Sequence, residues 1–355
     1  MSYNEIVFFS IFLIFVGGML ALDLGVFSKK NHIITFKEAG IWSMVWVAAA
    51  LVFYTILYTH GDLIHGIEDF SRLREIVYRF GDEQQVHIND HDFAESVQNY
   101  RHNLSIEFMT GYLTEYALSV DNIFVIIMIF TSFGVREKYF KKVLFWGILG
   151  AIIMRFGFIF LGAALIQKFA WILYLFGGFL IFTGAKMFLE QSGDDDEKIE
   201  PEKHFIVRLA SRYFSVFPRY VGEYFFIKKN GHVMLTPLFM VLLIIEFTDL
   251  IFAVDSVPAV FSITQDPYVV FFSNIFAIMG LRSMFFFLTN IMHLFHYLKT
   301  GLAVLLIFIG GKMIAHHWLE PLGFKTEYSL YIIIGILGVS VIASLAFPKK
   351  KHHAH

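Results

Sequence analysis

The sequence contains no cysteine among its 355 residues. This absence excludes disulfides, zinc–thiolate sites, iron–sulfur clusters and catalytic thiols together. Charged residues are also scarce: they make up 16% of the chain, compared with about 25% in a typical soluble protein. The net charge of -2, without a basic patch interleaved with aromatic residues, does not indicate a nucleic-acid partner. The sequence has no P-loop, no glycine-rich phosphate cradle and no nucleophile–base pair, so neither an ATP-driven protein nor an enzyme is expected.

Long apolar runs dominate instead, and hydrophobic residues make up 57% of the chain. Windows of about 20 apolar residues identify membrane-spanning helices. Nine such windows occur, at residues 5–27, 36–58, 104–131, 142–166, 169–189, 233–262, 267–293, 299–318 and 328–347. The first lacks the basic region and cleavage site of a signal peptide, so we expect it to be retained. The pattern predicts an all-α polytopic membrane protein with about nine transmembrane helices.

Two polar stretches interrupt the apolar runs, and both are too charged for a bilayer. The predicted organisation is two N-terminal helices (1–58), an external loop (59–103), a three-helix unit (104–190), a cytoplasmic loop (191–232), a second three-helix unit (233–320) and a last helix with a basic tail (321–355). The first loop contains several histidines, namely His60, His65, His87, His91 and His102. Their spacing matches no ligand motif, so we expect a solvated loop, with a weak divalent-metal sink as the alternative.

Lysine and arginine predict the orientation of the chain. With nine spans, 18 of these residues flank the membrane on the side of the C-terminus and six flank it on the other side. Because cytoplasmic loops carry the excess of positive residues, the N-terminus is expected outside and the C-terminus in the cytoplasm.

Two parts of the sequence repeat the same order of charged residues. LIFTGAKM (Leu180–Met187) is nearly repeated as LIFIGGKM (Leu306–Met313). Each copy follows an arginine in an apolar span and, further upstream, a Val-Asp pair with another acid six residues before its aspartate. Since each unit has three spans, an odd number, the second must start from the opposite side of the membrane. This is the inverted-repeat layout of secondary transporters, although a duplication kept for packing alone is the alternative.

Five acidic residues lie well away from the ends of the predicted spans, namely Glu115, Asp121, Glu246, Asp249 and Asp255. A carboxylate at the bilayer centre costs at least about 2.5 kcal/mol, so these groups are expected to face the interior of the bundle. The cations available to balance them are Arg155, Lys186, Arg282 and Lys312. Buried salt bridges that only fix the helix register are the alternative to a ligand site.

Oxygen ligands without a thiolate suit hard cations such as Mn²⁺, Mg²⁺ or Ca²⁺. We expect Asp121 and Asp255 to meet near the midplane and bind such an ion, together with the amide of Asn122. Pro258 predicts a kink that would free the carbonyl of Val254 as a further ligand. The remaining three acids are expected to serve as second ligands or as proton carriers.

Several of these segments resemble one family. GYLTEYALSVDNIFV, GAIIMRFGFIF and the stretch from TPLFM to IMGLR are similar to the TerC family of bacterial integral membrane proteins. The resemblance runs through spans three to eight, with ALDLGVF adding the first. It implies a LysE-like fold in the bacterial inner membrane, a link to tellurite resistance, and export of a divalent cation, with manganese the leading substrate and no permanently bound cofactor.

By motif match the resemblance points to Glu115, Asp121, Asn122, Glu246, Asp249 and Asp255. Coupling to protons is expected, and the oligomeric state stays open. The rival interpretation is a membrane scaffold of a stress-response complex, on which a soluble partner docks through residues 191–232 without any transport.

Overall fold

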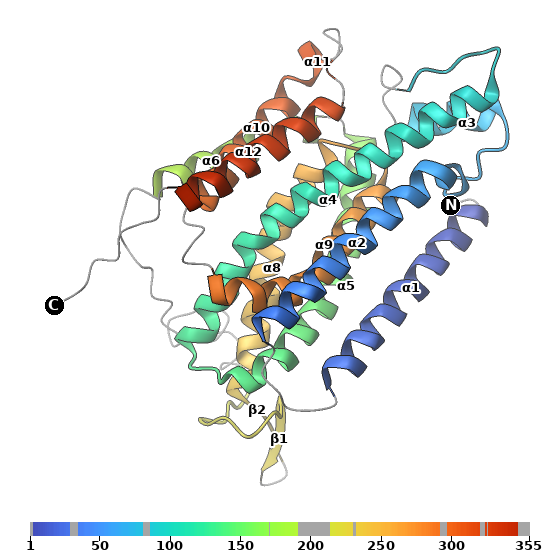
Figure 1. The fold of residues 1–355 in the computed structure, drawn as a ribbon. Helices are drawn as coiled ribbons and strands as arrows, with labels where there is room; N and C mark the ends of the chain where they lie inside the picture. Colours follow the sequence, from blue (N-terminus) through green and yellow to red (C-terminus); the bar gives the residue numbers. More distant parts are fainter. Residues whose placement is uncertain are drawn as a thin grey trace.

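The computed structural model describes residues 3–28, 35–80, 86–169, 171–190, 214–229, 232–291, 297–319, 324 and 326–346. These residues are mostly helical (Figure 1). The long helices are α1 (Tyr3–Ser28), α2 (Phe36–His60), α4 (Phe93–Ser132), α5 (Phe140–Lys168), α6 (Ile172–Glu190), α8 (Pro237–Phe261), α9 (Pro267–Ile291), α10 (Leu298–Ile314) and α12 (Thr326–Ala346). The shorter elements are η1 (Gly61–Leu63), α3 (Phe70–Phe80), η2 (Glu137–Tyr139), α11 (His316–Leu319), β1 (Phe226–Lys229) and β2 (His232–Leu235).

Each predicted span corresponds to one long helix, which confirms the all-α membrane fold. Within the described residues, eight helices are long and apolar enough to cross a membrane, and α10 is a shorter apolar helix. Its 17 residues span about 25 Å at a rise of about 1.5 Å per residue. That length is slightly less than the hydrocarbon core of about 30 Å, so α10 falls just short of a full span.

The polar segment 59–103 folds against the bundle. It contains η1 and α3, and α4 begins inside it at Phe93, where Asp92 caps the helix by accepting a hydrogen bond from the Glu95 amide at 3.0 Å. The buried face of α3 consists of Leu73, Ile76, Val77 and Phe80. The expectation of a solvated loop was therefore wrong for this part, because a stripe of apolar side chains docks α3 onto the core.

Local sequence signals account for the starts of several helices. Thr35 caps α2 by accepting from the Glu38 amide at 3.3 Å, and Thr236 caps α8 ahead of a proline at its first turn. Pro258 lies inside α8, which nevertheless continues to Phe261. The proline thus falls in the last turn of the helix and does not end it.

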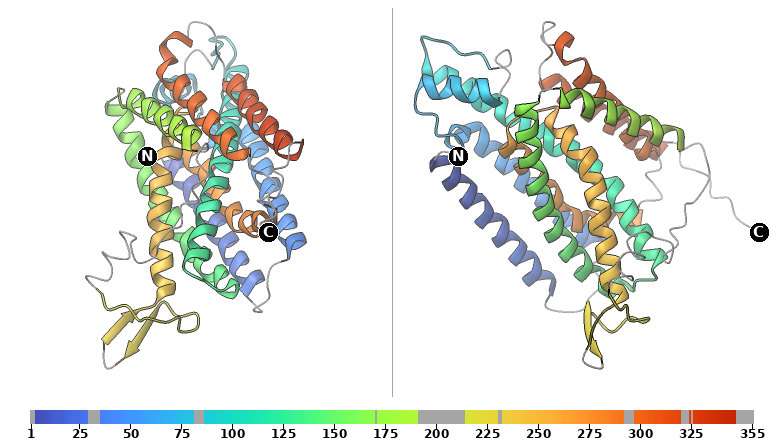
Figure 2. Two further views of the ribbon diagram at one scale, coloured as in Figure 1. Left: turned by 90° about the vertical axis from the view of Figure 1, so that its left-hand side faces the viewer. Right: turned by 180° about the vertical axis from the view of Figure 1, so that it is seen from behind.

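Helix α9 is the centre of the bundle, because its residues 267–286 are all buried. It contacts α2, α4 and α5. Helices α6, α10 and α12 form a group beside the other spans, and the β1–β2 hairpin projects beyond the start of α8 (Figure 1, Figure 2). Strand β1 lies in the predicted loop 191–232, but β2 extends beyond it to Leu235, so the predicted span 233–262 begins a few residues too early. Residues 191–213, 230 and 231 of this loop lie outside the described part.

Glycines allow α6 and α10 to approach closely. A methyl group added at Gly184 would come within 2.9 Å of the Ile307 side chain, and one added at Gly310 within 2.9 Å of the Ile181 side chain. Only glycine fits at such positions without moving the partner helix.

Candidate functional site

The polar residues of the membrane region gather around α8. Thr248 and Asp249 lie one turn before Phe252, and Asp255 and Ser256 lie one turn after it. Because residues three and four apart share a helix face, both pairs lie on the same side of α8 as Phe252. Opposite this face lie α4, α5 and α9 towards Asp249, and α4, α6 and α10 towards Asp255.

Arg155 of α5 is fully buried and joins four helices. Its Nη1 donates to Glu115 Oε1 of α4 and, at 2.7 Å, to Asn274 Oδ1 of α9. Its Nη2 lies 3.3 Å from Asp249 Oδ1 of α8, and its Nε lies 3.5 Å from Asp249 Oδ2. We call these four residues, Glu115, Arg155, Asp249 and Asn274, the Arg155 cluster.

The Arg155 cluster is not fully paired. It holds two carboxylates against one guanidinium. Within the described residues, Glu115 Oε2 and Asn274 Nδ2 are buried without a hydrogen-bond partner. An unpaired buried polar atom is costly, so the cluster has capacity for a further ligand or a proton.

A cavity of about 210 Å³ lies beside Asp255. Its polar lining comes from Asn122, Thr183, Lys186, Asp255 and Ser256. Thr183 donates to Asp255 Oδ1 at 3.2 Å, and Ser256 Oγ is buried without a hydrogen-bond partner in the described structure. The cavity therefore presents a carboxylate, two hydroxyls and an amide, with a lysine in the same wall. Its other lining residues are Leu118, Met187, Phe252, Leu302 and Leu306.

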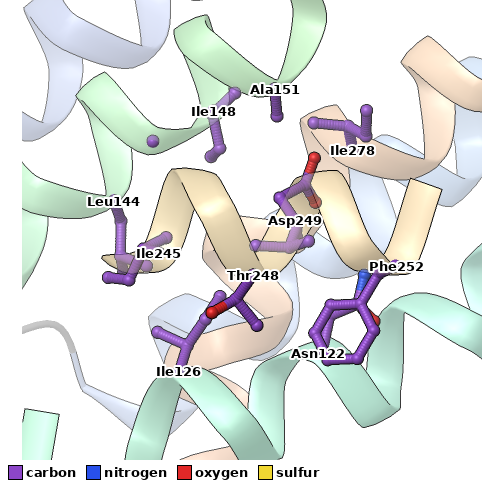
Figure 3. Close-up of a pocket in the computed structure, with 12 residues that line it drawn as sticks. Asn122, Ile126, Leu144, Ile148, Ala151, Ile245, Thr248, Asp249, Phe252 and Ile278 are labelled. Carbon is purple, nitrogen blue, oxygen red and sulfur yellow. The ribbon is translucent and has the colours of Figure 1, made fainter. Parts of the chain in front are cut away.

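A second, smaller cavity of about 30 Å³ lies beside Asp249. Asp249 and Thr248 of α8 line this space together with Asn122 and Phe252 (Figure 3). The rest of its lining is apolar and comes from Ile126, Leu144, Gly147, Ile148, Ala151, Ile245, Ile278 and Leu281. Asp249 thus contributes both to the Arg155 cluster and to the wall of this cavity.

The structure places the other predicted acids less centrally. The half-buried Glu246 carboxylate lies against the backbone of α5, since a methyl group at Gly150 would collide with it. Glu246 is not among the described residues that line either cavity. Asp121 lies in α4, but its side chain is outside the described part, so its predicted meeting with Asp255 stays a prediction.

The predicted cations have different surroundings. Arg155 is in the cluster described above, and Lys186 lines the larger cavity. Lys312 donates to the Ser262 carbonyl at 3.1 Å, just beyond the end of α8, where a positive charge stabilises the helix dipole. Arg282 is buried in α9.

A second buried cluster lies where α1, α9 and the polar segment meet. His65 is fully buried between two carboxylates: its Nδ1 lies 3.0 Å from Glu5 Oε1 and its Nε2 lies 2.7 Å from Asp266 Oδ2. Arg72 reaches Glu5 Oε1 at 3.2 Å and the His65 carbonyl at 3.1 Å, and Tyr268 donates to Glu5 Oε2 at 3.4 Å. We call these five residues the His65 cluster, and His65 contradicts the expectation of solvated histidines.

Ion pairing determines the charge of His65. Burial on its own would lower the pKa of this imidazole. The charges of Asp266 and Glu5 and their hydrogen bonds outweigh burial and raise the pKa to about 9. The ring is therefore a cation at neutral pH, and its two N–H groups donate to the two carboxylates.

Several residues of these sites escape prediction from the sequence. Thr183 is the one polar difference between LIFTGAKM and LIFIGGKM, which is a signal that could have identified it. Asn274, Phe252 and the His65–Asp266 pair carry no such signal, because they are common residue types without a spacing motif. Among the described side chains, no group of three His, Asp or Glu converges as in a resident metal centre.

Buried charges, the cavities beside Asp249 and Asp255, and eight candidate spans define a polytopic helical membrane protein with a polar interior. The chain belongs to the Integral membrane protein TerC family, whose pattern matches residues 100–352.

Curated relatives align with nearly the whole chain. An uncharacterized membrane protein of Myxococcus xanthus is 42% identical over 343 residues, covering 97% of this chain and 92% of that protein. The "Putative membrane-bound redox modulator Alx" of Escherichia coli K12 is 38% identical over 340 residues, covering 93% of this chain and 92% of that protein. An uncharacterized membrane protein of Rickettsia bellii is 36% identical over 335 residues, covering 94% of this chain and 96% of that protein. No solved structure matches the chain.

Proposed function

We propose that the protein exports a divalent cation, with Mn²⁺ as the leading substrate, by alternating access. The observation that carries the proposal is the cavity of about 210 Å³ beside Asp255. Its wall combines this carboxylate with the hydroxyl of Thr183, the amide of Asn122 and the unpartnered hydroxyl of Ser256. Lys186 in the same wall neutralises the carboxylate when no cation is bound.

The ligand chemistry supports a hard cation. All the donors are oxygens or an amide, and the sequence has no cysteine that would favour a soft metal. Mn²⁺, Mg²⁺ and Ca²⁺ all accept such donors. Manganese is preferred because the resemblance of the membrane motifs implies it.

The contact between α6 and α10 supports an inverted repeat. Gly184 and Gly310 occupy the fifth position of LIFTGAKM and LIFIGGKM, and Ile181 and Ile307 occupy the second. Gly184 packs against Ile307 while Gly310 packs against Ile181. A reciprocal contact of this kind is expected from a two-fold axis, here relating two halves of one chain.

Orientation and energy source complete the proposal. The excess of lysine and arginine favours an external N-terminus and a cytoplasmic C-terminus in the bacterial inner membrane. Protons are the proposed exchanged ion, because the Arg155 cluster holds one more acid than base and has unpaired atoms for a proton. ATP is not proposed, since the sequence lacks a P-loop.

The name of the Escherichia coli relative suggests a redox role for that protein. In this chain, thiol–disulfide exchange is excluded by the absence of cysteine. A contribution to redox balance would therefore be indirect, through the level of a redox-active metal such as manganese.

Metal accumulation in cells tests the proposal. Asp255→Asn keeps the size of the side chain but removes its charge, so cells producing it should retain manganese and become as sensitive to it as cells without the protein. Glu137→Gln, at an exposed position in η2, is the matched control and should export normally. Normal export by Asp255→Asn at equal membrane abundance would refute the proposal. Loss of function only on altering residues 191–232 would instead favour the scaffold interpretation.

A further inference from the structure

The order of side chains on α8 suggests more than one position for the transported ion. Asp249 and Asp255 are six residues apart, which is about 9 Å along a helix axis. Oxygen ligands of one divalent cation lie about 2.0–2.6 Å from it, so a single ion cannot contact both carboxylates along a continuous helix. Each carboxylate instead faces its own cavity.

The two cavities are adjacent. Of the described residues, Asn122 and Phe252 line both of them. Phe252 lies midway between the two aspartates in the sequence of α8. An aromatic ring cannot ligate a hard cation through oxygen, whereas the amide oxygen of Asn122 is available from either side.

The cavities differ in size and polarity. The larger one, of about 210 Å³, includes the exposed Lys186 in its wall. The smaller one, of about 30 Å³, is lined by apolar side chains apart from Asn122, Thr248 and Asp249. Since one water needs about 10–15 Å³ by this measure, the smaller cavity holds about two or three water-sized particles. A cation must therefore lose most of its hydration shell to enter it.

We propose that the two cavities are successive binding positions for the transported cation, and that Phe252 is the partition between them. The inference rests on the proposed export function for the identity of the ion. One position lies beside Asp255 and Ser256, where the ion keeps part of its hydration shell. When the Phe252 ring moves aside, Asn122 transfers the ion between this position and the one beside Thr248 and Asp249. There it competes with Arg155 for the Asp249 carboxylate, which couples ion position to the contact joining α4, α5, α8 and α9.

The first unit has a counterpart to this pattern. Thr114, Glu115, Leu118, Asp121 and Asn122 follow the same spacing as Thr248, Asp249, Phe252, Asp255 and Ser256. Leu118, at the position of Phe252, also lines the larger cavity. The first unit thus has an aliphatic residue where the second has the aromatic partition.

The absence of cysteine permits a direct test, because a single introduced thiol is the only one in the chain. Ser256→Cys places it in the larger cavity and Thr248→Cys in the smaller one. The purified full-length variants react with Ag⁺, an ion-sized thiol reagent, in chloride-free buffer. Thiols that remain are counted with a fluorescent maleimide after denaturation.

Thr248→Cys should react about 10- to 1,000-fold more slowly than Ser256→Cys, because an open partition is a minor state populated at about 0.1–10%. Adding Phe252→Ala should bring the Thr248→Cys rate close to that of Ser256→Cys, while Phe252→Leu should raise it less. Ile251→Ala, at an exposed neighbouring position, is the matched control and should leave both rates unchanged. Saturating Mn²⁺ should slow the reaction of both thiols.

Equal rates for the two thiols in the presence of Phe252 would overturn the proposal, as would a slow Thr248→Cys reaction that Phe252→Ala does not accelerate. Failure of Mn²⁺ to protect either thiol would also overturn it. The rates at which the introduced thiols react with Ag⁺ do not depend on transport. This experiment can therefore fail independently of the export experiment with Asp255→Asn. Normal export by Asp255→Asn with the expected silver rates would refute the proposed function while leaving the partition intact.

Discussion

The Arg155 cluster and the His65 cluster both bury acids beside a cation, but they differ in how completely they are paired. In the His65 cluster both ring nitrogens bond carboxylates, and Asp266 Oδ1 accepts from the Tyr268 amide at 2.9 Å. A cavity lined in part by Asp266 is only about 10 Å³. The Arg155 cluster leaves buried polar atoms without partners and adjoins a cavity of about 30 Å³. The first arrangement suits holding elements together, and the second suits a site that exchanges ligands.

The largest loss of stability is expected from removing Arg155, the cation of the incompletely paired Arg155 cluster. Arg155→Ala leaves two buried carboxylates without their partner, and breaking a buried ion pair in this way costs about 3–5 kcal/mol. The free energy of unfolding, measured by denaturation with SDS in detergent, should fall by that amount. Adding Glu115→Gln and Asp249→Asn should restore part of it, because no charge is then left unpaired. A loss below about 1 kcal/mol for Arg155→Ala would show that water or another group replaces the guanidinium.

The His65 cluster should respond to pH rather than to a transported ion. The pKa of His65 is raised from 6.5 to about 9, so the folded state binds the proton more tightly than the unfolded state. The resulting stability is fully present below about pH 6.5 and is lost as pH rises through about 9; it amounts to about 3 kcal/mol. The slope of unfolding free energy against pH should therefore be negative between these values.

His65→Gln should remove most of that slope, since glutamine does not titrate. His91→Gln, at an exposed position in the same polar segment, is the control and should keep the slope of the unmodified protein. An identical slope in all three proteins would mean that His65 is neutral in the folded state.

The sequence predicts the Arg155 cluster better than the His65 cluster, and the reason is physical. Apolar windows and an acid–arginine repeat are local patterns, and they predicted both the spans and the residues Glu115, Arg155 and Asp249 that the structure brings together. The contacts of His65 join residues 60 and 201 positions apart in the chain. Such contacts depend on how α1 and α9 pack, which no local period reveals. The same limit applies to Phe252, whose role depends on cavities on both of its sides.

The smallest change in stability is expected from removing an exposed ion pair of the polar segment. Arg74 and Asp90 form an ion pair at 2.5 Å, with 58% and 65% of their side chains exposed. Exposed pairs are screened by water and constrain two long side chains, so they contribute about 0–1 kcal/mol. Arg74→Ala should therefore change the free energy of unfolding by less than about 1 kcal/mol, measured in the same detergent as the His65 variants.

Comparing Arg74→Ala with Arg72→Ala shows whether burial or charge stabilises the polar segment. Arg74 and Arg72 both lie on α3, but the Arg72 side chain is only 24% exposed and reaches Glu5, itself 6% exposed. Arg72→Ala should cost more than Arg74→Ala, because it leaves the Glu5 carboxylate buried with one donor fewer. If the two variants lowered the free energy of unfolding equally, the stability of the His65 cluster would depend on net charge alone and not on burial. A larger cost for Arg72→Ala instead ties that stability to the contact between α3 and the start of α1.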